Sequence, residues 1–277
     1  MDIPIGSVVE SIIRFLLNNF GPIFTGISNI VEAFMSWVQG ILLFLPPLVF
    51  ILALSIIAWL LSNKKIAIFT LLSLLLVFGM GLWISFVKTF VLVLVAGLFT
   101  LIIGIPVGIL ISKYKGVDRI ITPILDFMQT MPPFVYLIPA VMFFGIGQVP
   151  GVISTIIFAM PPAIRLTKLG LNQVPDELEE VGHSFGLNPF EMLFKIRIPM
   201  ALPSIMAGIN QSIMLSLSMV VIASMIGAEG LGSRVLNGIQ RMEIGIGFEA
   251  GLGVVILAII LDRITSNINI GKKSKTQ

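Results

Sequence analysis

Long apolar runs separated by short polar turns make up most of the chain. Runs close to the length of a membrane-spanning helix recur at 41–62, 66–86, 88–112, 133–148, 150–168, 200–227 and 247–264. A helix needs about 20 apolar residues to cross the hydrocarbon core of a bilayer. The pattern therefore predicts an all-α polytopic membrane protein with about seven transmembrane helices. The fourth run is short and is interrupted by Pro139.

The polar positions divide the chain into segments. Residues 1–40 combine Glu10 and Arg14 with apolar residues at helical spacing. This pattern is typical of a helix lying in the membrane interface, and we place the segment on the extracytoplasmic side. The remaining segments are expected to be accessory transmembrane helices at 41–86, a transmembrane core at 87–266 and a cytoplasmic tail at 267–277.

Composition supports a membrane protein and narrows its chemistry. Hydrophobic residues make up 57% of the chain, charged residues 11%, and the mean hydropathy is +1.07. By comparison, about a quarter of the residues in a soluble domain are charged. The absence of Cys excludes disulfides, cysteine–zinc sites and thiol catalysis. A net charge of +3 spread over the loops does not indicate nucleic-acid binding, so membrane lipid is the expected surrounding partner.

The basic residues orient the predicted helices. With the N-terminus outside, only Arg14, Lys88, Arg234 and Arg241 lie on the outer side, which leaves 13 of the 17 Lys and Arg residues inside. Cytoplasmic loops of membrane proteins are enriched in Lys and Arg. We therefore expect a multi-pass protein of the cell membrane with its N-terminus outside and its C-terminus in the cytoplasm.

A polar segment at 176–199 interrupts the apolar pattern on the cytoplasmic side. Asp176 followed by Glu179 predicts a capping box that opens a short helix. Gly186 stands where a left-handed residue would end that helix. The segment therefore begins with one short, capped helix.

A second helix start follows directly. Asn188, Pro189 and Glu191 supply an N-cap residue, a proline at the first helical position and an acid at the third. We expect this helix to end before Pro199, because the residue preceding a proline is disfavoured in the α conformation.

Both short helices carry apolar side chains at helical spacing. These residues are Leu178 and Val181 in the first helix and Phe190, Leu193 and Phe194 in the second. Two capped helices with apolar faces on the water side of a membrane suggest a segment that docks into a groove of another protein. The alternative is an amphipathic loop that packs on its own chain.

The spacing of this segment resembles the EAA loop of type I ABC importer permeases. That motif has a Glu, two small residues, a Gly four positions further on, and an Ile and a Pro at fixed distances. The matching residues here are Glu180, Val181, Gly182, Gly186, Ile196 and Pro199. Val181 and Gly182 replace the usual alanines, and Ile198 replaces the usual Leu before the proline.

Longer stretches resemble the permeases of glycine betaine/proline-type ABC importers. They are ILDFMQTMPPFVYLIPAVMFFGIG (124–147), MPPAIRLTKLGLNQVP (160–175), MAGINQSIMLSLSMVVIASMIGAEGLG (206–232) and VVILAIILDR (254–263). The resemblance implies a type I ABC importer transmembrane domain and the import of glycine betaine or a related compatible solute for osmoprotection.

The resemblance also implies partners. It implies a homodimer of permeases, two cytoplasmic ABC ATPase subunits and a separate extracytoplasmic substrate-binding protein. The residues that would couple the permease to the ATPase are Glu179, Glu180, Gly182, Gly186, Phe190, Leu193, Phe194, Ile196 and Pro199. No cofactor is expected on this chain, because ATP and Mg would be bound by the partner ATPase.

The chain has few residues that would indicate nucleotide binding or catalysis. GKKS at 271–274 lacks the upstream glycine of a nucleotide-binding loop, since Ser266 stands in that position. No cluster of His, Cys or acidic residues falls within the apolar runs, so we do not expect an enzyme. Asn210, Gln211 and Ser216 are candidates for lining a polar translocation pathway. Packing and interhelical hydrogen bonding are the alternative role for these three.

Other transport functions remain open at this point. A type I ABC permease for another small solute, such as methionine or choline, would share the docking segment. A channel or ATP-independent carrier would have no use for it. Glycine betaine, proline betaine, carnitine, choline and proline are all compatible with the residues of the permease, because solute selection would lie mainly in the binding protein.

Overall fold

The computed structural model describes residues 5–267, and every regular element in that range is a helix. In chain order these are α1 (Ile5–Phe44), α2 (Pro47–Leu61), α3 (Lys64–Gly79), α4 (Trp83–Lys113), α5 (Lys115–Thr130), α6 (Pro133–Phe144), α7 (Gln148–Asn172), α8 (Asp176–Ser184), α9 (Pro189–Met192), the π-helical turn η1 (Leu193–Arg197), α10 (Ile198–Ser224), α11 (Leu231–Gln240) and α12 (Ile244–Asn267). The predicted all-α class is confirmed.

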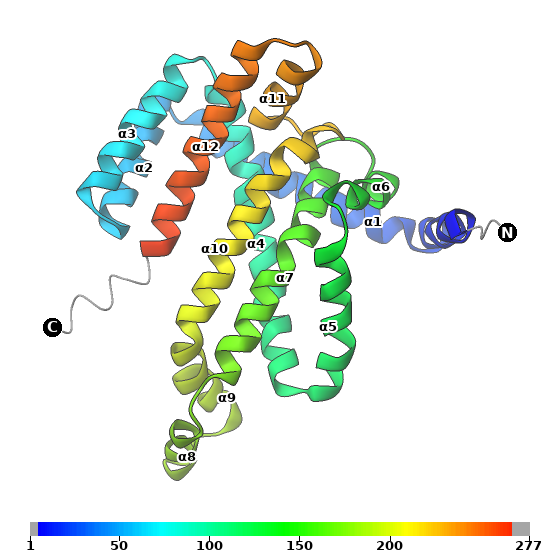
Figure 1. The fold of residues 1–277 in the computed structure, drawn as a ribbon, viewed down its shortest axis with the longest axis vertical. Coiled ribbons are helices and arrows are strands. Elements are labelled where there is room, and N and C mark those ends of the chain that lie inside the picture. The colour runs from blue at the N-terminus through cyan, green and yellow to red at the C-terminus, as the bar shows by residue number, and fades with distance from the viewer. Residues whose placement is uncertain (1–4, 268–277) are drawn as a thin grey trace.

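Three of the longer helices, α4, α7 and α10, lie side by side and form the centre of the molecule (Figure 1). Small residues let their backbones approach closely. A Cβ on Gly108 of α4 would stand 2.6 Å from the Cβ of Thr167 on α7, and one on Gly208 of α10 would stand 3.1 Å from the Pro162 carbonyl oxygen. Such approaches between helices are typical of packing within membranes.

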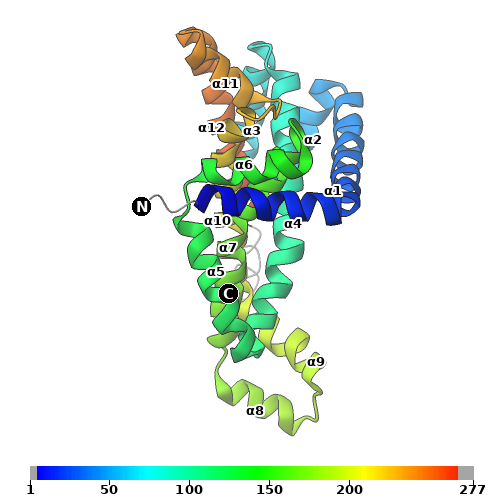
Figure 2. The same cartoon turned by 90° about the vertical axis from the view of Figure 1, so that its right-hand side faces the viewer.

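The remaining helices surround this centre. The hairpin of α2 and α3 lies beside α12, and α11 folds back onto α12 (Figure 1). Helix α1 does not run parallel to the bundle but crosses its side, as Figure 2 shows. Helices α8 and α9 project from the end of the bundle opposite to α11 (Figures 1 and 2).

The predicted count of seven spans is not reproduced. Within residues 5–267, five helices are long and apolar enough to cross a membrane, or six if the bent pair of α5 and α6 is one span. The predicted spans at 41–62 and 66–86 correspond to α2 and α3, which have only 15 and 16 residues. Prolines at 46 and 47 delay the start of α2, and the turn at Gly81, with φ +72°, ends α3 early.

The fourth predicted span, 133–148, is also wrong as a straight crossing. Helix α6 has only 12 residues and meets α5 at a bend of 106°. The break falls at Met131 and Pro132, where the backbone is extended because the residue before a proline avoids the α conformation. Sequence reasoning did not count α5 as part of a span, since Asp118, Arg119 and Asp126 interrupt its apolar pattern.

The N-terminal segment forms one long helix. Helix α1 is continuous over 40 residues, includes Pro22 and ends at Phe44. It is long and apolar enough to cross a membrane, yet only 11% of its most apolar stretch is buried, and it crosses the side of the bundle (Figure 2). Its position in the membrane interface stays a prediction.

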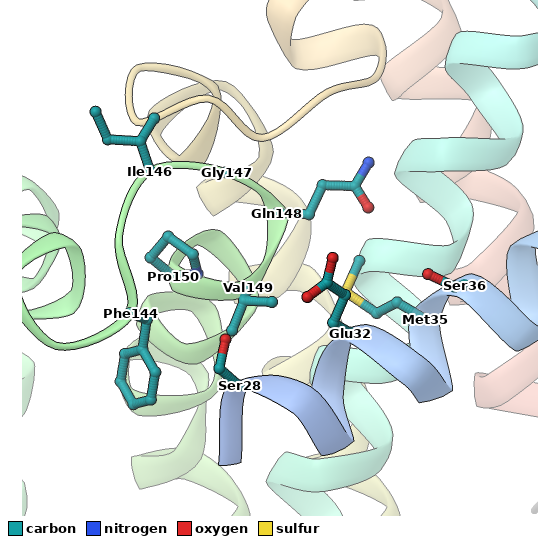
Figure 3. A pocket seen from close by; sticks show the side chains of 10 residues that line it. All are labelled: Ser28, Glu32, Met35, Ser36, Phe144, Ile146, Gly147, Gln148, Val149 and Pro150. Atoms are coloured by element: carbon teal, nitrogen blue, oxygen red, sulfur yellow. The ribbon is translucent and has the colours of Figure 1, made fainter. Parts of the chain in front are cut away.

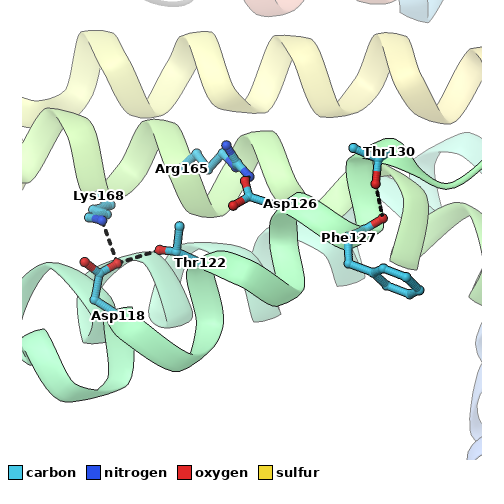
Figure 4. Close-up of polar contacts among 7 residues, drawn as sticks. All are labelled: Asp118, Thr122, Asp126, Phe127, Thr130, Arg165 and Lys168. Carbon is cyan, nitrogen blue, oxygen red and sulfur yellow. Dashed lines mark hydrogen bonds and ion pairs between the residues drawn. The ribbon is translucent and has the colours of Figure 1, made fainter.

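Ion pairs fasten α5 to α7. Lys168 donates to Asp118 at 2.5 Å, and Asp118 also accepts from Thr122 at 2.7 Å (Figure 4). Two turns further along α5, Arg165 pairs with Asp126. These contacts compensate the charged side chains of a helix that is otherwise rich in apolar residues.

Candidate functional site

Helix α8 opens the projecting segment without the predicted capping box. Pro175 is the N-cap residue, and Asp176 already lies in the first helical turn, so its side chain caps no backbone N–H. Its charge, like those of Glu177 and Glu179, still complements the helix dipole. Glu179 instead lies with Oε1 3.0 Å from Nε of Arg197 in η1, which links the start of α8 to the bundle.

Gly186 ends α8 as predicted. Its φ of +73° is left-handed, and two hydrogen bonds close a Schellman motif around it. The Gly186 N–H donates to the His183 carbonyl at 2.9 Å, and the Leu187 N–H donates to the Gly182 carbonyl at 3.1 Å. This glycine therefore fixes the angle between α8 and α9.

The predicted capping box of α9 is confirmed. Oδ1 of Asn188 accepts from the N–H groups of Phe190 and Glu191 at 3.1 and 2.9 Å, and the Glu191 carboxylate accepts from the Asn188 N–H at 3.1 Å. Glu191 also pairs with Lys195 at 2.7 Å. The hydrogen bonds from Lys195 and from the Asn188 backbone hold the pKa of Glu191, on the water side of the bundle, below its usual range.

The expectation that this helix ends before Pro199 is wrong. The chain continues from α9 through η1 into α10, and Ile198 keeps helical angles of −63° and −47°. In an α-helix the proline ring would collide with the carbonyl four residues earlier, that of Lys195. One wide π turn, with the Ile198 N–H donating to the Leu193 carbonyl, accommodates the ring without ending the helix.

Gly182 brings the two arms of the segment into contact. It is buried, and a Cβ added to it would lie 2.6 Å from Cε of Met192 and 2.8 Å from Cδ1 of Ile196. Met192 is itself only 4% exposed. The small residue at this position of the EAA-like motif therefore lets α8 lie directly against the start of the long helix.

Apolar side chains on the outside of the same segment form an exposed surface, which we call the coupling patch. Its residues and exposed fractions are Val181 (51%), Phe185 (82%), Phe190 (69%) and Phe194 (51%). The rings of Phe190 and Phe194 lie with their centroids 4.5 Å apart. Sequence reasoning missed Phe185, although it follows Val181 by four residues and so continues the helical spacing of this face; it is the C-cap residue of α8.

Leu193 does not share this surface. It is partly buried and packs against the cluster of Leu171, Ala201 and Ile205, where α7 and α10 meet. Glu180 is exposed, as is His183. Ile196 contacts the inside of the segment near Gly182, and the exposed Pro199 lies in the first turn of α10.

A cavity of about 790 Å³ opens beside the segment, at the same end of the bundle. Its walls come from the end of α4, the start of α5, the end of α7, α8 and η1, and they include Lys115, Asp118, Arg119, Lys168, Asp176, Glu179 and Arg197. This end of the molecule therefore carries many of the basic residues that the positive-inside argument assigned to the cytoplasm.

The three candidate pathway residues lie on different faces of α10. Nδ2 of Asn210 donates to Oγ of Ser266 on α12 at 2.8 Å, whereas Gln211 is exposed. Ser216 is buried and donates to the Ser212 carbonyl at 2.9 Å. Their role in translocation stays a prediction. Within residues 5–267, no group of three or more His, Cys, Asp or Glu side chains is placed to hold a metal ion.

A solved structure shares this fold. The chain is similar to a solved structure of an inward-facing MetNI methionine ABC transporter, with a TM-score of 0.59 and 22% identity, over 69% of this chain and 95% of that chain. At this identity the likeness shows the fold, that of a type I ABC importer permease.

Sequence comparison gives the family. Residues 101–270 match the binding-protein-dependent transport system inner membrane component family, and the chain belongs to it. Curated relatives include the glycine betaine transport system permease protein OpuAB of Bacillus subtilis, 47% identical over 99% of this chain and 97% of its own length. The glycine betaine/proline betaine permease ProW of Escherichia coli is 48% identical over 99% of this chain and 77% of its own length. The glycine betaine/carnitine permease GbuB of Listeria monocytogenes is 47% identical over 99% and 98%.

Proposed function

We propose that this chain is the permease of an ATP-driven importer for glycine betaine or a related quaternary ammonium solute. The names of relatives that share almost half of its residues over nearly its whole length support this solute class. Import of such solutes serves osmoprotection, because they can accumulate in the cytoplasm without disturbing its chemistry.

The exposed coupling patch is the observation that supports coupling of this chain to an ATPase. Three of its four residues are phenylalanines, at the tip of a projecting segment whose backbone is fixed by a Schellman motif and a capping box. Exposed apolar patches bordered by polar residues are typical of protein–protein contacts. We assign this surface to a cytoplasmic ATPase subunit, which would bind ATP and Mg. Two permease copies and two ATPase copies would form the transporter.

Reconstitution tests the proposal. The permease, its ATPase and its binding protein are placed in liposomes with ATP on the ATPase side, and uptake of radiolabelled glycine betaine is measured. We expect uptake that stops when the ATPase, the binding protein or ATP is omitted. Uptake without the ATPase would indicate a channel or carrier. Uptake of methionine but not of glycine betaine would overturn the solute class.

A further inference from the structure

A second cavity lies at the opposite end of α7 from the coupling patch. It has a volume of about 230 Å³, is partly open to solvent, and is lined by one face of α1 and by the turn that joins α6 to α7 (Figure 3). Ser28, Glu32, Met35 and Ser36 line it from α1. Because α7 runs from this end to the segment formed by α8, α9 and η1 (176–197), which we call the coupling segment, the cavity faces the outer side if the coupling patch is cytoplasmic.

Glu32, an exposed residue of α1, gives this cavity a negative charge. Its carboxylate points from α1 toward the first turn of α7 at Gln148 and Val149 (Figure 3). Within the part of the chain that the structure describes, Glu32 has no ion-pair or hydrogen-bond partner. Among the other acids outside the cytoplasmic end, Glu10 and Glu229 are paired with Arg14 and Lys88. Glu243 and Glu249 form no ion pair within residues 5–267, but neither lines this cavity.

One aromatic side chain, that of Phe144, lines the same cavity, and two further rings pack behind it. Phe24, two turns before Glu32 on α1, stacks on Phe143 with ring centroids 4.4 Å apart and lies edge-on to Phe144 at 5.9 Å. Aromatic faces and a carboxylate are the groups that attract a quaternary ammonium ion. The opposite wall is the N-terminal end of α7, where the helix dipole favours negative charge.

The turn between α6 and α7 is held in a fixed shape. Gly145 and Gly147 have φ values of +79° and +143°, and the Gly147 N–H donates to the Ile226 carbonyl at 2.9 Å. A Cβ on Gly227 would lie 2.9 Å from Cγ2 of Ile146. The cavity wall is therefore locked against the turn that follows α10, a helix of the central bundle.

We propose that this cavity is a transit site for the solute on the outer side of the permease, with Glu32 as the counter-ion of the quaternary ammonium group. The inference rests on the proposed solute class and deepens it, because it gives the permease its own preference for a cation. The chemical class of ligand is a small trimethylammonium compound. A zwitterion such as a betaine matches both walls, with its ammonium group beside Glu32 and its carboxylate toward the N-terminal end of α7.

The absence of Cys from the chain allows a direct test. Ser28→Cys places one thiol on the cavity wall, and its reaction rate is measured with two methanethiosulfonates, one carrying a trimethylammonium group and one neutral. Tetramethylammonium chloride is then added as a competitor, with sodium chloride at equal ionic strength as its control. The neutral reagent reports access to the cavity and so corrects for any change in local structure.

We expect S28C to favour the cationic reagent, and S28C/E32Q to lose that preference by about threefold, the size of an exposed ion pair. S28C/E32D should retain most of it, and S28C/E10Q should behave as S28C. Tetramethylammonium should protect S28C but not S28C/E32Q. An unchanged rate ratio in S28C/E32Q, or equal protection of both, would overturn the inference.

Uptake assays separate this inference from the proposed function. If the reconstituted wild-type complex fails to import glycine betaine while the thiol still prefers the cationic reagent, the proposed solute is wrong and the cation site stands. If the complex imports glycine betaine but E32Q leaves both the labelling ratio and the KM for uptake unchanged, the transit site is wrong and the proposed function stands.

Discussion

Gly186 and Gly182 affect the coupling segment in different ways. Gly186 is left-handed, and no heavy atom lies within 4 Å of the position of a Cβ, so backbone conformation alone restricts this position. Gly182 has ordinary helical geometry but no room, because Met192 and Ile196 fill the space beside it. The backbone conformation of Gly186 therefore sets the angle of α8, and the lack of a side chain at Gly182 sets its distance from Met192 and Ile196.

Replacing Gly186 by a residue with a side chain should destabilise the left-handed turn that ends α8. Gly186→Val forces a β-branched residue into the left-handed region, at a cost of about 1–2 kcal/mol, and should release α8 from its fixed angle. We expect less ATPase to copurify with this variant and weaker coupling of hydrolysis to uptake. Gly186→Asn is the control, because Asn enters this region more readily and should preserve both. Equal coupling in the Val variant would show that the angle is unimportant.

At Gly182, the effect of a substitution should depend on the volume of the new side chain. The atoms nearest to an added Cβ are the ends of the flexible Met192 and Ile196 side chains, so Gly182→Ala should be accommodated. Gly182→Leu adds several further atoms against a buried surface and should cost about 1–3 kcal/mol. The measurement is limited proteolysis of the segment in detergent, together with ATPase pull-down. Equal protease resistance of the Leu and wild-type proteins would contradict the packing role.

Among the elements, α8, α9 and η1 together carry the four residues of the coupling patch. Each patch phenylalanine has at least half of its surface free. Burying the remainder of the Phe194 side chain in a partner groove is worth about 1.4 kcal/mol, or about tenfold in Kd. Phe194→Ala should weaken ATPase binding by that factor, measured by titrating the detergent-solubilised permease with labelled ATPase.

Phe134 on α6 supplies a matched control, since its exposed fraction of 53% is close to the 51% of Phe194 and it lies outside the coupling segment. Phe134→Ala should leave the Kd unchanged. If the two variants lose affinity equally, the effect comes from general destabilisation, and the patch has no special role.

Local chemistry explains which elements could be predicted. The Asn188 capping box and the Gly186 terminus follow from side chain–backbone hydrogen bonds and from φ, which act within a few residues of sequence. The helix continues through Pro199 because one π turn makes room for the proline ring, and the spacing of apolar residues gives no sign of such a turn. The part that α5 plays in a bent span depends on ion pairs with α7 that compensate Asp118 and Asp126, and a pattern along one segment carries no information about such a neighbour. These features were therefore missed.

At the scale of the whole molecule, the coupling patch and the Glu32 cavity lie at opposite ends of α7. Because the chain has no Cys and these two features lie at opposite ends, labelling of single introduced cysteines can test the orientation of the protein in the membrane. Ser184→Cys, on α8, should resist a membrane-impermeant maleimide in intact cells, whereas Ile146→Cys, at a position 80% exposed in the α6–α7 turn, should react. The reverse pattern would invert the predicted orientation.

Solute-stimulated ATP hydrolysis tests the central claim most directly. The reconstituted complex is supplied with binding protein, with and without glycine betaine, and the rate of phosphate release is measured for the wild type, Phe134→Ala and the combined variant F185A/F190A/F194A. We predict stimulation in the first two and none in the third, with all three permeases present at equal levels in the membrane. Stimulation of the combined variant to the wild-type rate would contradict the coupling role of the patch.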